Sequence, residues 1–424
     1  MTATDTYRAI DAVWRMESPR LIAALTRMVH DVGIAEDLAQ DALVAALEQW
    51  PESGIPDNPG AWLMATAKHR AVDHFRRNAR LQRKHEELGR EMEEKEMAVP
   101  DFADALDDHF GDDLLRLVFI SCHPVLPSEA RVALTLRLLG GLTTEEIARA
   151  FLVPEPTVAQ RIVRAKRTLS ESGLAYETPR GEELSRRLAS VLEVVYLIFN
   201  EGYTAARGED LLRPQLCHEA LRIGRVLASI APYEPEAHGL LALMELNASR
   251  TAARTDQAGE PILLLEQNRA LWDQLQIRRG MQALGRAREL GGADGFYALQ
   301  AAIIACHAGA SRAEDTDWSR ISGLYGQLAV LVRSPVIELN RAVAVGMADG
   351  PEAGLAIADR LVEEPALKTY HLLGSVRGDL LHKLGRYEEA RAALEAAAKL
   401  AGNRREQDLL KRRAAEAALA AMSS

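Results

Sequence analysis

A basic segment near the middle of the chain has the residue types and spacing of a surface that binds DNA. Residues 157–169 carry four cations and no acid. The apolar residues of this segment are Val158, Ile162, Ala165 and Leu169. Their steps of four, three and four predict a helix with one buried face and a polar opposite face. The residues expected to contact DNA are Thr157, Gln160, Arg161, Arg164, Lys166 and Arg167.

The residues before this segment predict a second, shorter helix and a tight turn. Pro154 and Pro156 would break a helix interior, but a turn and a first helical turn tolerate them. Upstream, Thr143 or Thr144 can cap a helix, with Glu146 placed for a capping box. Two short helices of which the second is basic make a helix-turn-helix, whose second helix enters the major groove. A helical hairpin with a solvated basic face remains the alternative.

The composition limits where DNA can bind. The 424 residues are 48% hydrophobic, enough for more than one core, and the net charge is −10. That charge argues against nonspecific coating of nucleic acid, so any contact must come from local basic patches. Residues 68–84 form a second patch, with seven cations against one acid, whereas 86–113 carry twelve acids.

The same survey predicts a cytoplasmic protein without a membrane span. The chain has three cysteines and a polar N-terminus, and it contains no apolar run near 18 residues.

Helical spacing of apolar residues almost everywhere predicts an all-α fold. The expected segments are a helical bundle at 1–78, an acidic linker at 79–111, the helix-turn-helix at 112–172, a short linker at 173–185, and helix pairs at 186–424.

The last segment has the small and large residues of a tetratricopeptide (TPR) repeat, with GRYEEA as the turn between helices. These residues are Gly378, Leu381, Gly385, Tyr387, Ala390, Leu394 and Ala397. A weaker copy includes Ala342, Val345, Gly354, Ala358 and Leu361. An α-solenoid of TPR-like hairpins is therefore expected, and a plain helical bundle is the alternative.

With these motifs placed, residues 1–172 resemble a bacterial extracytoplasmic-function (ECF) sigma factor, a small promoter-recognition subunit of the σ70 family. IAEDLAQDAL at 34–43 is similar to the acidic part of sigma domain 2 that docks on the β′ clamp helices of RNA polymerase. By this resemblance, Glu36, Asp37, Gln40 and Asp41 bind the polymerase core.

The resemblance also assigns the two basic patches. NPGAWLMATAKHRAVDHFRR at 58–77 is similar to the part that melts the promoter and recognises its −10 element. The residues implied there are Asn58, Lys68, His69, Arg70, Arg76 and Arg77. Trp62 and Phe75 are more readily explained as core residues than as base stackers. GLTTEEIARAFLVPEPTVAQRIVRAKRTL at 141–169 is similar to sigma domain 4, which reads the −35 element, except that Leu152 replaces the usual turn glycine.

The C-terminal part resembles the extension carried by one subgroup of these factors. Its motifs are YLIFNEGY, CHEALRIG and DTDW. The implied partners are core polymerase, through the β′ clamp helices and the β flap, promoter DNA, and an intramolecular or protein partner of the extension, which would regulate activity in cis.

Other functions fit the sequence less well. Each cysteine precedes a histidine, as in Cys122-His123. Adjacent side chains on a helix point about 100° apart, so such a pair cannot chelate one metal ion by itself. The cysteines are therefore expected to be small buried hydrophobic residues rather than a metal or redox site. No metal or other cofactor is expected, and no catalytic motif predicts an enzyme. The main rival is a stand-alone helix-turn-helix regulator with a TPR sensing domain, in which 34–77 would have no role.

Overall fold

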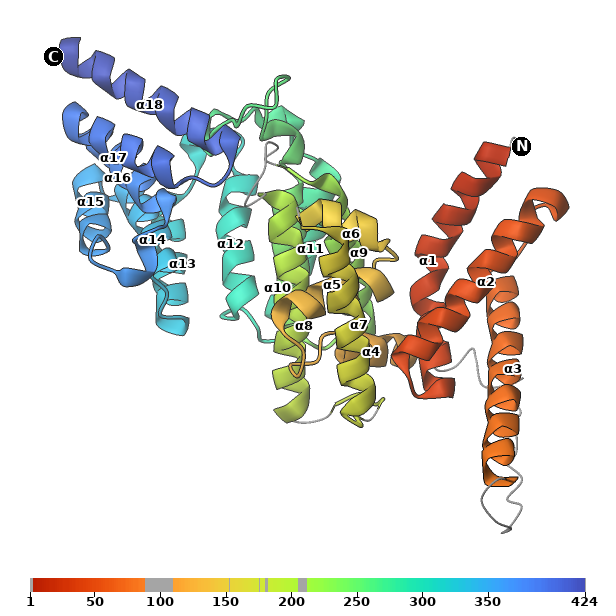
Figure 1. Ribbon diagram of the computed structural model, residues 1–424. Helices are drawn as coiled ribbons and strands as arrows, with labels where there is room; N and C mark the ends of the chain where they lie inside the picture. The colour runs from red at the N-terminus through yellow and green to blue at the C-terminus, as the bar shows by residue number, and fades with distance from the viewer. Residues whose placement is uncertain are drawn as a thin grey trace. The chain divides into compact units, whose positions relative to one another are not determined.

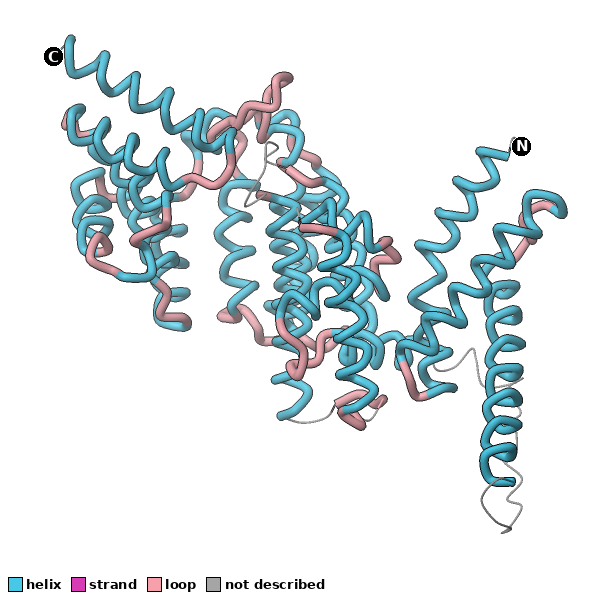
Figure 2. Tube along the Cα trace, in the orientation of Figure 1, coloured by secondary structure: helices cyan, strands magenta, loops and turns pink. Residues whose placement is uncertain are grey.

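The computed structural model describes residues 3–87, 110–151, 153–174, 176–179, 182–204 and 212–423. Across these ranges the fold is helical (Figures 1 and 2), without a strand and with one isolated bridge between Thr255 and Pro261. The predicted all-α class is confirmed. The chain divides into two compact units, Met1–Val194 and Val195–Ser424. No helix in the described ranges is long and apolar enough to cross a membrane.

The first unit begins with three helices that pack on one another. They are α1 (Ala3–Val29), α2 (Val32–Ser53) and α3 (Pro59–Glu87). Leu21 and Leu25 of α1 and Leu63 of α3 are almost completely buried, so they form the core of this group. Side chains begin two of the helices: Asp31 accepts the amide of Ile34 at 2.9 Å, and Asn58 accepts that of Ala61 at 3.0 Å.

The helix-turn-helix forms where the sequence predicts it. Its elements are α4 (Phe110–Ser121), α5 (Ser128–Leu138), α6 (Thr144–Phe151) and α7 (Glu155–Glu171). Thr143 and Glu146 make the predicted capping box. The Thr143 hydroxyl accepts the backbone N–H of Glu146 at 3.1 Å, and the Glu146 carboxylate accepts the backbone N–H of Thr143 at 2.8 Å. Pro154 occupies the N-cap position of α7, without a capping side-chain hydrogen bond, and Pro156 lies in the first turn of the helix. Most of the predicted acidic linker, and the predicted departure at Leu152, lie outside the described residues.

The first half of α8 (Glu182–Tyr203) completes the first unit. Arg187 donates to the carbonyl oxygen of Phe119 at 3.1 Å, and Ser190 donates to that of Cys122 at 2.6 Å. Phe119 lies in the last turn of α4 and Cys122 directly follows the helix, where C=O groups have no partner within the helix. This half of α8 therefore holds the helix-turn-helix part from one side.

The second unit is a succession of helices in which neighbours along the chain pack in pairs. They are α9 (Pro214–Ile230), α10 (Pro235–Ala248), α11 (Gln274–Glu289), α12 (Phe296–Gly309), α13 (Trp318–Leu331), α14 (Pro335–Ala348), α15 (Pro351–Arg360), α16 (His371–Lys383), α17 (Tyr387–Leu400) and α18 (Arg404–Ser423). Short 3-10 turns occur at Thr251–Ala253, Leu264–Glu266, Arg269–Leu271, Ala313–Asp315 and Pro365–Leu367. This is the expected arrangement of helical hairpins.

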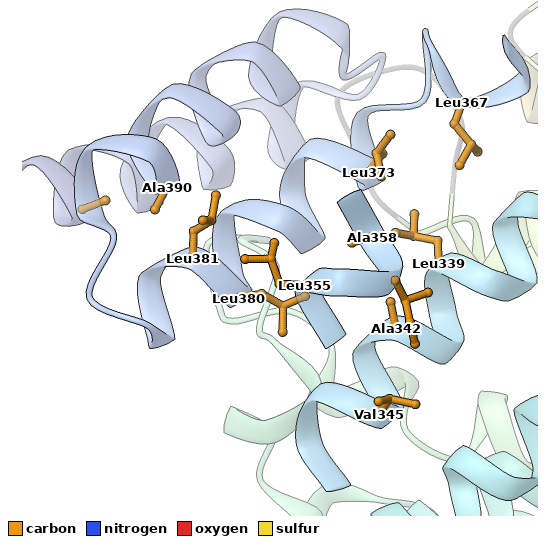
Figure 3. Packing of buried hydrophobic residues seen from close by; sticks show 12 residues of the cluster. Leu339, Ala342, Val345, Leu355, Ala358, Leu367, Leu373, Leu380, Leu381 and Ala390 are labelled. Atoms are coloured by element: carbon orange, nitrogen blue, oxygen red, sulfur yellow. The ribbon is translucent and has the colours of Figure 1, made fainter. Parts of the chain in front are cut away.

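Small residues bring the helices of these hairpins close together. Gly354 of α15 faces α14 so closely that a Cβ atom there would lie 2.6 Å from the carbonyl oxygen of Ala342 and 2.7 Å from the Cα of Gly346. Around this contact, Figure 3 shows buried Leu339, Leu355 and Ala358 gathered between the helices. In the predicted GRYEEA turn, Gly385 has φ +72°, a conformation that favours glycine, and α17 follows directly.

Substitution of Gly354 tests this close contact. We expect Gly354→Ala to lower the free energy of unfolding by about 1 to 3 kcal/mol, because α14 and α15 must move apart to admit the methyl group. The measurement is thermal and urea unfolding of the full chain. Gly323→Ala in α13 is the matched control. Its Cβ would meet nothing within 4 Å, so it should raise stability by about 0.5 to 1 kcal/mol. Equal effects of the two changes would contradict the packing argument.

Candidate nucleic-acid interface

The predicted DNA-binding residues of α7 divide between two sides of the helix. Gln160, Arg164 and Arg167 are exposed, and their spacing of four and then three places them on one face, here called the reading face. Thr157 and Arg161 are half-buried beside it. The opposite face is buried against α5 and α6 through the predicted apolar residues Val158, Ile162, Ala165 and Leu169. The helix therefore presents amide and guanidinium groups to solvent from a fixed support.

The exposed cation at the end of the reading face is balanced within the helix. Arg167 pairs with Glu171 at 2.6 Å, and both side chains are largely exposed. Solvent screens an exposed pair of this kind, so it contributes little to stability and a phosphate can take the place of the carboxylate at small cost.

Val163 is a residue of the reading face that the sequence reasoning missed. Its side chain is 64% exposed and lies between Gln160, Arg164 and Arg167 along the helix. The signal was present in the sequence, because the buried face is already filled at steps of four, three and four, which leaves Val163 pointing away from it.

Lys166 lies on the side of α7 that faces α2. Its Nζ atom is 2.6 Å from Oε2 of Glu36 and 3.9 Å from Oδ1 of Asp37. The structure thus brings together a predicted DNA contact and two predicted polymerase contacts, which the sequence places in different domains.

Glu36 is the centre of a buried polar cluster that joins α2 to the helix-turn-helix. Its side chain is 3% exposed. Oε1 accepts hydrogen bonds from Arg137 of α5 and from Gln40 of α2, each at 2.6 Å. With Lys166, two cations from another part of the fold therefore surround one carboxylate. A carboxylate buried this deeply requires such partners, since its desolvation costs several kcal/mol.

Two further contacts connect the same parts of the first unit. Arg15 of α1 pairs with Glu146 of the capping box at 2.7 Å. Burial raises the pKa of Glu146, but the hydrogen bonds from Thr143 and the charge of Arg15 outweigh it, so the pKa is lower than usual. The hydroxyl group of Tyr176, which follows α7, is a hydrogen-bond donor that lies 3.1 Å from the carbonyl oxygen of Ala23 and 2.9 Å from that of Asp113.

The other predicted polymerase contacts of α2 are accessible. The side chain of Asp37 is 77% exposed, and Asp41 is exposed one turn further along. Gln40 is half-buried by its bond to Glu36. Of the four predicted residues, two therefore face solvent and two belong to the buried cluster.

The predicted −10 residues lie along α3 and just before it. His69, Arg70 and Arg76 are exposed, and the side chain of Arg77 lies outside the described residues. Lys68 is half-buried, and burial together with the charge of Arg27 lowers its pKa. Asn58 is exposed, although its side-chain oxygen is occupied as the cap of α3.

The aromatic residues near these cations, Trp62 and Phe75, are both partly buried. Trp62 is half-buried and packs edge-on against Trp50, with ring centroids 5.3 Å apart, and Trp50 is 2% exposed. Phe75 is half-buried. Trp62 therefore packs against the core through Trp50 while part of its surface stays accessible.

The cysteines lie in helices or at their ends. Cys122 and Cys217 are buried, and Cys306 is partly so. Burial raises the pKa of the Cys217 thiol to about 12, which keeps it protonated near neutral pH. Within the described ranges, no group of three or more His, Cys, Asp or Glu side chains is placed to hold a metal ion.

Three family models match the chain in succession. Sigma-70 region 2 matches residues 13–81, and Sigma-70, region 4 matches residues 116–169. A family of unknown function (DUF6596) matches residues 187–288. The first two cover α2 with Glu36 and α7 with its reading face.

Similar proteins occur in several bacteria. An uncharacterized protein of Rhizobium meliloti is 41% identical over 395 residues, which is 93% of this chain and 92% of that protein. The probable ECF RNA polymerase sigma factor SigI of Mycobacterium tuberculosis is 28% identical over 39% of this chain and 56% of its own length. The RNA polymerase sigma-H factor of Pseudomonas aeruginosa is 27% identical over 39% of this chain and 86% of its own length. No solved structure matches the chain.

Replacement of Arg137 tests the buried cluster. We expect Arg137→Gln to lower the free energy of unfolding by about 1 to 3 kcal/mol, because Glu36 stays buried with one cation fewer. Urea unfolding and hydrogen exchange of the α2 amides measure the effect. Arg149→Gln is the control, since Arg149 pairs with Glu145 at the surface of α6 and both side chains are 72% exposed. If both variants unfold alike, the cluster does not stabilise the unit.

Proposed function

Because the chain belongs to the ECF sigma factors of the σ70 family, in the group with a long C-terminal extension, we propose that it directs transcription initiation at specific promoters. The observation that carries this proposal is the exposed reading face of α7 together with regions 2 and 4 in one chain. As a sigma factor, it binds RNA polymerase and promoter DNA and acts with the polymerase in the cytoplasm.

Each DNA element has a matching surface. The reading face of α7 recognises the −35 element in the major groove, where glutamine and arginine can pair with base edges. The exposed cations of α3, Arg70 and Arg76, hold the −10 region, with His69 beside them. The chain supplies binding energy to open the duplex there, because cations and polar groups stabilise a displaced strand. It catalyses no reaction itself.

Polymerase binding occurs through α2. Asp37 and Asp41 are available to the β′ clamp helices, whereas Glu36 is in the buried cluster with Arg137 and Lys166. Glu36 cannot reach the polymerase, and Lys166 cannot reach a phosphate, while they are paired with each other. Both proposed contacts therefore require α2 and α7 to separate, and core polymerase and DNA compensate for the lost pairs.

For the second unit we propose a regulatory role with a protein partner. A cavity of about 180 Å³ opens between α8, α10, α12, α13 and α14. Its lining includes the amide side chains Asn200, Asn247, Gln300 and Asn340 and contains no charged residue. Asn247 and Gln300 already bond within this unit. Asn200 and Asn340 can offer amides, which both donate and accept, to the backbone groups of an uncharged peptide segment.

Run-off transcription tests the proposed function. The purified full chain is mixed with bacterial core polymerase and with fragments of genomic DNA that contain promoters. We expect discrete transcripts that are absent with core polymerase alone, and their start sites locate the −10 and −35 elements. If the protein does not bind core polymerase and instead binds duplex operators by itself, the stand-alone regulator is correct. Weak duplex binding by the protein alone is expected, because its net charge is −10.

Two substitutions with opposite expected effects test polymerase binding. Asp37→Ala should weaken the affinity for core polymerase, because it removes an exposed carboxylate of the proposed contact. Arg137→Gln should strengthen that affinity, because Arg137 belongs to neither proposed surface and its loss makes Glu36 easier to expose. Competition binding with a labelled chain measures both affinities, and Arg149→Gln again serves as the control. An unchanged affinity for Asp37→Ala contradicts its role, and an unchanged affinity for Arg137→Gln contradicts the proposed separation.

A further inference from the structure

The reading face of α7 contains one apolar residue whose presence the fold does not require. Val163 is 64% exposed, and the buried side of α7 is complete without it. Valine is also a poor choice for an exposed helical position, because its branched side chain loses rotamer freedom in a helix. Neither packing nor helix formation accounts for this valine.

The neighbours of Val163 indicate what it contacts. A single exposed apolar residue is ordinary on most protein surfaces. Here, however, Val163 lies at the edge of the reading face, beside Gln160, Arg164 and Arg167, which face solvent on the same side of the helix. When these side chains approach phosphates and base edges, Val163 must enter the major groove with them. The apolar group that the standard base pairs present there is the C5-methyl group of thymine.

We propose that Val163 is a specificity-determining residue that contacts the methyl group of a thymine in the −35 element. This inference rests on the proposed function, since it requires α7 to lie in the major groove of a promoter. Gln160 and Arg164 select bases by hydrogen bonds, and Val163 adds one apolar contact beside them. The −35 element must then contain a thymine on one of its strands within reach of the middle of α7.

The contribution of the contact follows from its size. Changing valine to alanine, or thymine to uracil, removes about one or two carbon atoms that the contact would bury. We therefore expect a loss of roughly four- to tenfold in promoter affinity for either change. Because both changes remove the same contact, the second should cost little once the first has been made.

The experiment is a cycle that combines Val163→Ala with the replacement of thymine by uracil. Holoenzyme is assembled from the full chain and core polymerase, and a promoter located by run-off transcription is prepared with each −35 thymine changed to uracil in turn. Uracil lacks only the methyl group. The measured quantity is promoter affinity by competition binding. Val330→Ala in α13 is the matched control, because Val330 is another helical valine and is 86% exposed.

We expect one thymine at which uracil weakens the wild-type holoenzyme roughly four- to tenfold and leaves the Val163→Ala holoenzyme unchanged. Val330→Ala should respond like the wild type at every position. The proposal is overturned if Val163→Ala leaves promoter affinity unchanged. It is also overturned if uracil, at every thymine, weakens the affinity of the Val163→Ala holoenzyme by the same factor as that of the wild type. Specific transcripts without this coupling reject the role of Val163 alone, whereas the absence of specific transcripts rejects the proposed function as well.

Discussion

The arrangement of the first unit depends on one buried carboxylate. Glu36 is 3% exposed, and its cationic partners, Arg137 and Lys166, come from α5 and α7 rather than from its own helix. A carboxylate in this position is stable only while those partners remain, because an unpaired buried charge costs several kcal/mol. The cluster therefore fixes α2 against the helix-turn-helix. It also joins α2, the helix proposed to bind polymerase, to α7, the helix proposed to read DNA.

This constraint explains how an acidic chain can carry a basic recognition helix. One cation of α7, Lys166, is neutralised by α2, and another, Arg167, by Glu171 within the helix. The two pairs differ in burial, so they differ in cost: the exposed pair exchanges with phosphate almost without penalty, whereas the buried pair is lost only when α2 moves. In the proposed function, DNA binding and polymerase binding are thus linked through the Lys166–Glu36 pair. On this proposal, a polymerase that draws α2 away makes another cation of α7 available to DNA.

The sequence predicts local structure better than it predicts this cluster. The capping box of Thr143 and Glu146, the prolines at the start of α7 and the apolar face of α7 all depend on residues within a few positions of one another. The environment of Glu36, by contrast, depends on residues far away in the chain, since its partner Arg137 lies 101 positions away. Only tertiary packing brings such residues together. For the same reason, the sequence pattern predicts that Lys166 contacts DNA but gives no sign of the Glu36 carboxylate beside Lys166.

The start of the extension shows a related limit of sequence patterns. The family of unknown function matches from residue 187, yet Arg187 and Ser190 bond to the end of α4, and Arg131 of α5 donates to Ser190. Arg131 also pairs with Glu193 at 3.1 Å. The first half of α8 therefore stabilises the helix-turn-helix whatever the rest of the extension does. Truncation at residue 186 would remove these partners and leave carbonyl groups of α4 without donors, so a loss of activity would report damage to the reading helix. Single substitutions in the cavity of the second unit separate regulation from folding, because those side chains lie beyond α4 and α5 in the chain and pack within their own unit.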